Sequence, residues 1–105
     1  MVGQFTIRSG IAEIQAHHVR LLAARKTVIP SLSYSIISHD MTIETNGCLV
    51  LMVSATGVFM RCNLIVDQSL VEDGELLTRV FNLSKERVVI PKHEVVSQLI
   101  SLGLA

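Results

Sequence analysis

Charged and aromatic residues are scarce in this sequence. Only 17% of its 105 residues are charged, and aromatic residues make up 4%, with no tryptophan. Lysine plus arginine balance aspartate plus glutamate at nine each, so the net charge is zero. The basic residues are scattered and form no stripe that could neutralise a phosphate backbone. We therefore expect no nucleic-acid partner.

Cysteines and long apolar runs are also few. Cys48 and Cys62 are too few for a disulfide framework or a zinc site, so we expect two buried, reduced thiols. No apolar stretch approaches the roughly 18 residues that a membrane span needs, and the N-terminal segment has no signal-peptide pattern. We expect no membrane partner and a soluble, intracellular protein, in the cytoplasm or nucleus of a host cell.

The apolar half of the chain is supplied mainly by valine, isoleucine and leucine. These residues favour strands that are buried on at least one face. A length of 105 residues fits a single domain, residues 1–105, with a modest core. So small and apolar a chain is expected to cover part of its surface with another copy of itself.

Hydrophobic spacing predicts a mainly β protein. Short apolar or alternating runs indicate strands at 4–8, 27–30, 34–37, 41–45, 48–53, 76–83, 87–90 and 95–102. Asn46-Gly47 is a hairpin signal, and the continuous apolar run that follows it predicts a strand buried on both faces. The stretch 11–22 fits either helix or coil. Only the region around Glu13 and the turn after Gly57 could hold a short helix, so an antiparallel sandwich, barrel or jelly roll is expected.

Six segments in chain order resemble motifs of the trimeric dUTPases, all-β enzymes that remove pyrophosphate from dUTP. These segments are TVIP (27–30), NGC (46–48), SATG (54–57), LIVDQSLVEDGEL (64–76), VFNLSKERVVI (80–90) and KHEVVSQLI (92–100). The resemblance implies a compact dUTPase-like jelly roll or distorted barrel, with one short helix or none, assembled as a homotrimer.

Most catalytic groups of that family are replaced in this chain. Arg20 stands where the resemblance places an acidic residue of the first motif, and Ala55 stands at the phosphate-binding arginine. The segment 69–74 has no aromatic residue to stack on uracil, and Val95 replaces the arginine of the fourth motif. A glycine-rich fifth motif, the C-terminal arm, does not occur in these residues. The comparison implies a divergent member that keeps the scaffold and has lost the chemistry.

A few candidate site residues remain. Glu72 is a weak candidate for a catalytic base, and its bland interpretation is a residue of a solvated acidic turn. Phe59 is a candidate either for filling the pocket that binds substrate in the dUTPases or for contacting a partner protein. The ligand-binding candidates are Ser54, Thr56, Gly57 and Gln98, for which Arg20, Arg61 and Arg79 could supply replacement charge. No metal site is predicted, and Mg²⁺ is expected only with a bound nucleotide.

The four histidines do not predict a metal site. His17 and His18 are adjacent, so in a strand they would point to opposite faces. We expect them, together with His39 and His93, to lie on the surface or in loops.

Three functions remain open at this point. The first is a catalytically inactive dUTPase-like protein, a viral or phage accessory protein that acts by protein–protein interaction. The second is a nucleotide-binding or nucleotide-sequestering protein that uses remodelled subunit clefts. The third is a weak dUTP pyrophosphatase using Glu72 and Gln98.

Overall fold

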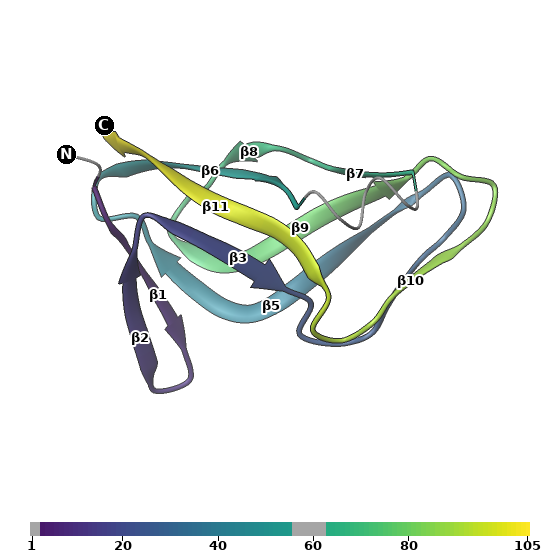
Figure 1. Ribbon diagram of the computed structural model, residues 1–105, viewed down its shortest axis with the longest axis horizontal. Coiled ribbons are helices and arrows are strands. Elements are labelled where there is room, and N and C mark those ends of the chain that lie inside the picture. Colours follow the sequence, from purple (N-terminus) through teal and green to yellow (C-terminus); the bar gives the residue numbers. More distant parts are fainter. Residues whose placement is uncertain (1–2, 56–62) are drawn as a thin grey trace.

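The described residues, 3–55 and 63–105, form eleven strands and no helix in the computed structural model (Figure 1). The strands are β1 (Phe5–Ser9), β2 (Ala12–Ala16), β3 (His18–Leu22), β4 (Thr27–Ile29), β5 (Tyr34–Glu44), β6 (Cys48–Ser54), β7 (Leu64–Val66), β8 (Ser69–Leu70), β9 (Gly74–Asn82), β10 (Val88–Ile90) and β11 (Val95–Leu104). No helix in this part of the chain is long and apolar enough to cross a membrane.

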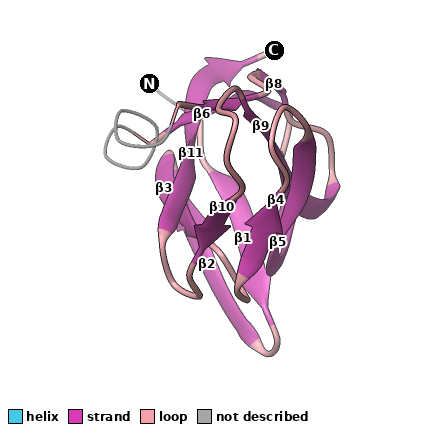
Figure 2. Ribbon diagram, turned by 90° about the vertical axis from the view of Figure 1, so that its right-hand side faces the viewer, coloured by secondary structure: helices cyan, strands magenta, loops and turns pink. Residues whose placement is uncertain are grey.

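Two larger sheets and one small ladder make up the fold. One sheet has the strand order β2-β1-β5-β9-β7, the other has the order β3-β11-β6-β8, and β10 pairs with β4 alone. All of the pairings between the described strands are antiparallel. Figure 2 shows the strands wrapped around a common interior. The predicted all-β architecture is confirmed.

The interior contains two clusters of buried apolar side chains. The first joins β1, β3, β5, β6, β9 and β11, and it includes Phe5, Leu21 and Leu99. The second lies toward the β4–β10 ladder and includes Ile29, Ile37 and Val80. Both clusters draw on the two sheets together, so burial of these side chains holds the sheets face to face.

The prediction of helix or coil for 11–22 is wrong, because this stretch forms β2 and β3. Gly10, with φ of 60°, opens a two-residue turn, and Ala12 then pairs with Ser9. Glu13 therefore lies in a strand, and no helix forms around it. The hairpin extends beyond the body of the molecule (Figure 1). Pairing with β1 and β11 decides the structure here, where the local pattern is ambiguous. The position after Gly57 lies outside the described residues.

The prediction that β6 is buried on both faces is also wrong. Cys48, Val50 and Met52 point inward and are buried, whereas Leu49 is exposed and Leu51 is half-buried. Only one face of the four-stranded sheet packs on the core, as is usual for antiparallel sheets. Cys48 is a buried thiol as predicted, and Cys62 lies outside the described residues.

Asn46-Gly47 forms the predicted turn, but the turn joins strands of different sheets. Both residues have positive φ, and Cys48 N donates to Thr45 O at 3.0 Å. The strand before the turn, β5, pairs with β1 and β9, while the strand after it, β6, pairs with β11 and β8. The turn therefore carries the chain across the sandwich instead of closing a hairpin.

Candidate functional site

The structure brings together two of the predicted ligand-binding residues, Ser54 and Gln98. Gln98 Nε2 donates to the backbone oxygen of Ser54 at 3.3 Å, and Gln98 Oε1 lies 2.7 Å from His18 Nε2. Since the amide oxygen can only accept, His18 Nε2 carries the proton in this contact. Arg20 lies directly opposite Gln98 across β3–β11. The outer face of the four-stranded sheet thus carries a polar row of His18, Arg20 and Gln98, in which His18 was not among the predicted ligand-binding residues.

Of the four residues of the SATG turn, the structure describes only the first two, Ser54 and Ala55. Ala55 is buried, and its backbone N donates to Val96 O at 3.2 Å. This contact fixes the end of β6 against β11. Thr56, Gly57, Phe59 and Arg61 lie outside the described residues, so their predicted roles stay predictions.

Glu72 lies in the exposed turn between β8 and β9. Its neighbour Asp73 accepts hydrogen bonds from the backbone N and Oγ1 of Thr45 at 2.8 and 2.7 Å. These two bonds lower the pKa of Asp73, because they favour the ionised carboxyl group. Asp73 therefore ties the β8–β9 turn to the end of β5, and the adjacent Glu72 remains in solvent.

One copy of the chain does not bring Glu72 close to Ser54. Val71 N donates to Val50 O at 2.8 Å, which places Glu72 beside the next residue of β6, Leu49. Ser54 is five residues further along β6, a separation of roughly 16 Å at the usual rise of a strand. A site that used both side chains would have to be assembled from more than one copy.

Arg79, one of the candidate replacement cations, already has two partners. Its guanidinium lies 5.3 Å from the centre of the Tyr34 ring, and its Nη1 is 3.8 Å from Asp67 Oδ2. By contrast, Arg20 is exposed and makes no ion pair with the described residues. Of the candidate cations that the structure describes, Arg20 is the one available to a ligand.

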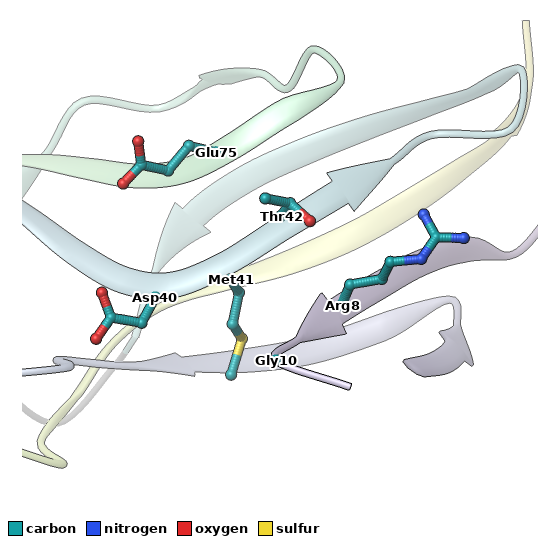
Figure 3. Close-up of a pocket in the computed structure, with 6 residues that line it drawn as sticks. All are labelled: Arg8, Gly10, Asp40, Met41, Thr42 and Glu75. Carbon is teal, nitrogen blue, oxygen red and sulfur yellow. The ribbon is translucent and has the colours of Figure 1, made fainter. Parts of the chain in front are cut away.

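A depression of about 390 Å³ lies on the outer face of the five-stranded sheet (Figure 3). Its lining includes Arg8, Thr42 and Glu75, which come from three neighbouring strands. The guanidinium of Arg8 pairs with Glu13 and Glu44, and these carboxylates raise its pKa. Because the Arg8 guanidinium is already paired with two carboxylates, the described lining of this depression offers no unpaired positive charge to an anionic ligand.

His39 is buried, which contradicts its predicted place on the surface or in a loop. Its Nδ1 donates to Leu22 O at 2.6 Å, and its Nε2 lies 2.7 Å from Thr78 Oγ1, which in turn lies 2.9 Å from Ser97 Oγ. Burial lowers the pKa of His39, although the hydrogen bond to Leu22 and the charge of Asp40 act in the opposite direction. The other three histidines are exposed as predicted.

Metal-binding chemistry has no support from these side chains. Within 3–55 and 63–105, no group of three or more histidine, cysteine, aspartate or glutamate residues is arranged to hold a metal ion.

Comparison with known proteins gives matches among solved structures only. No family model matches the chain, and no curated protein matches it. A dUTPase mutant from phage phi11 of S. aureus, described with a structural Mg(II) ion, is 13% identical, with a TM-score of 0.76 over 96% of this chain and 91% of that one. The Staphylococcus bacteriophage 80alpha dUTPase is 13% identical, with a TM-score of 0.77 over 96% and 90%. A mutant of the 80alpha enzyme with dUpNHpp is 16% identical, with a TM-score of 0.76 over 96% and 91%.

The chain therefore has a dUTPase-like all-β fold, which confirms the predicted fold. At these identities the likeness concerns the fold alone.

Proposed function

We propose that this chain is a catalytically inactive, dUTPase-like protein that works by binding other proteins, in a viral or phage regulatory role. The observation that supports this most is the position of Glu72. The only candidate base lies in an exposed turn, roughly 16 Å along β6 from the residues at the Ser54 end.

The surroundings of Glu72 oppose catalysis on a triphosphate. The adjacent depression of about 360 Å³ is lined by Glu72, Asp73 and Glu75, and no lysine, arginine or histidine of the described residues lines it. Phosphate groups need cations or N–H donors, and three carboxylates would repel them. Arg20 in the polar row is likewise unsuited to hold Mg²⁺, which prefers oxygen ligands.

Protein binding is supported by apolar side chains on the outer faces of both sheets. Ile36, Ile65 and Leu77 are exposed on the five-stranded sheet, and Leu49 and Leu102 are exposed on the other. Phage dUTPases of this fold are described as controlling the transfer of virulence genes. That description is of those proteins, and it makes a regulatory role for this chain a reasonable proposal.

We include a homotrimer in this proposal. Its support is the fold, which resembles that of the trimeric dUTPases, together with the exposed apolar side chains that a second copy would cover.

Nucleotide binding without turnover is the second candidate. It is favoured by the row of His18, Arg20 and Gln98, which places three polar side chains on an otherwise apolar sheet face. Mg²⁺ would enter only with the nucleotide.

A dUTP assay with Mg²⁺ tests the proposal, with thermal unfolding of the same sample as a second readout. We expect no hydrolysis above background. Turnover that Glu72→Gln abolishes and the matched exposed variant Glu86→Gln retains would overturn the proposal in favour of a weak pyrophosphatase. A rise in Tm without turnover, lost in Gln98→Leu, would favour the second candidate.

A further inference from the structure

Among residues 3–55 and 63–105, strand β9 has partners along both edges only at its C-terminal end. On one side it pairs with β5 along most of its length. On the other side, β7 covers Val80–Asn82, and Asp67 N then donates to Arg79 O at 2.9 Å. Beyond that bond, toward Gly74, the second edge has no backbone partner among the described residues.

The alternation of the strand shows which backbone groups this open edge presents. Because Arg79 O points toward the β7 side, the N–H and C=O groups of Leu77 and Glu75 point the same way. A strand edge with free donors and acceptors is a template for pairing with another extended segment. The open stretch spans about 10 Å at the usual rise per residue.

A groove borders the open edge. It is the depression of about 360 Å³, lined by Met52, Ser69, Leu70, Val71, Glu72, Asp73, Glu75, Leu76 and Leu77. The leucine and valine side chains would accept alternate apolar side chains of an added strand, as in other cases of strand addition. The groove and the backbone edge thus lie together.

The negative charge of the groove favours some extended partner segments over others. Of the nine described residues that line it, three are acidic and none is basic. The hydrogen bonds from Thr45 lower the pKa of Asp73 and keep that carboxylate ionised. The nearest arginine by sequence, Arg79, is paired with Asp67. Charge complementarity therefore calls for lysine or arginine in the occupant.

We propose that the open edge of β9 at Glu75 and Leu77 binds an extended, cationic segment of a partner protein by strand addition. This rests on the proposed function, because it names the class of partner that the protein would bind. Backbone hydrogen bonds supply pairing, and the carboxylates of Glu72 and Glu75 select for a basic sequence.

Fluorescence anisotropy with synthetic peptides tests the proposal. The probe is a labelled nonapeptide of alternating lysine and valine, compared at low salt with one of alternating glutamate and valine. A third peptide carries N-methyl groups on two adjacent central residues, so that neither of its edges can form a continuous ladder. We expect the lysine peptide to bind, and each comparison peptide to bind at least tenfold more weakly.

Variants of the protein distinguish the contribution of the acidic side chains from that of backbone pairing. Glu72→Gln/Glu75→Gln is expected to weaken binding of the lysine peptide by about five- to tenfold. The control Glu13→Gln/Glu86→Gln removes the same charge from other turns and strands and is expected to bind normally. Equal binding by both double variants, or full binding of the N-methylated peptide, would overturn the proposal.

Other outcomes also discriminate. Self-association that Glu72→Gln/Glu75→Gln abolishes, in the absence of peptide binding, would overturn the proposal and assign the edge to a second copy of this chain. Absence of both peptide binding and dUTP turnover would overturn this inference alone. Turnover of dUTP would overturn the proposed function whatever the peptides do.

Discussion

At the scale of single residues, the chain from His39 to Ser97 has one consistent set of hydrogen directions. Leu22 O can only accept, so His39 Nδ1 carries a proton, and in the neutral ring Nε2 must then accept from the Thr78 hydroxyl. The Ser97 hydroxyl completes the chain by donating to Thr78 Oγ1. A second proton on His39 would make Nε2 a donor to Thr78 Oγ1, so the Thr78 hydroxyl would lose its imidazole acceptor and would have to donate to a weaker one, Met52 Sδ at 3.3 Å.

The stability of the protein is expected to depend on the protonation of His39. Its pKa in the folded state is lower than the usual 6.5, so folding favours the neutral ring. Stability from this group is complete above pH 6.5 and is lost as the pH falls from 6.5 toward the folded-state pKa. Urea unfolding at about pH 7.5 and about pH 5.5 measures the effect. In His39→Gln the change in unfolding free energy between the two pH values should be smaller. An unchanged difference in that variant would contradict the assignment of this pH dependence to His39.

Two of these residue-level features were beyond sequence reasoning, for physical reasons. His39 occupies an inward position of β5, in the same alternating row as Ile37 and Ile43, and its partner Thr78 comes from β9. Asp73 is fixed by Thr45, a residue 28 positions away. Neither contact has a local signature, because each depends on how distant strands are placed. Ser54 and Gln98, by contrast, were named as ligand-binding candidates through the resemblance of their motifs, and the structure places them in contact.

At the scale of single elements, β11 offers a clean test of which face is buried. Leu99 is 0% exposed and belongs to the first core cluster, whereas Leu102 is 57% exposed. We expect Leu99→Ala to lower the free energy of unfolding by about 2–5 kcal/mol, because it removes buried methyl groups and leaves a cavity. Leu102→Ala, which removes the same atoms, should change it by less than about 1 kcal/mol. Urea denaturation of both variants checks this, and similar losses would mean that the two positions share an environment.

The prediction of strand positions succeeded where the alternation of apolar residues was clear, and it failed where the alternation was weak. The segments 76–83 and 95–102 correspond closely to β9 and β11. In β2, by contrast, every residue but Ala16 is exposed, so the strand has no buried face to impose a pattern on its sequence. β7 and β8 have only three and two residues, too few to show a period.

At the scale of the whole molecule, the proposed trimer has a measurable consequence. One chain has a mass of 11.5 kDa, so native mass spectrometry should give a species of three times that mass. If only the assembled form is fully stable, Tm should rise with protein concentration, because association removes folded chains from the unfolding equilibrium. A monomer at all concentrations, with a constant Tm, would contradict the homotrimer.

The pairing order of the four-stranded sheet also bears on synthesis at the ribosome. Every strand of the five-stranded sheet has been synthesised once Asn82 is made, since β9 is the last of its strands in the chain. The other sheet has β11 between β3 and β6, and Gln98 of β11 bonds to His18, 80 residues earlier. Until β11 is translated, β3 and β6 lack the strand that pairs with both of them and joins them in one sheet. The nascent chain thus passes through an interval, the synthesis of residues 83–104, in which one sheet has all of its strands and the other still lacks its central strand.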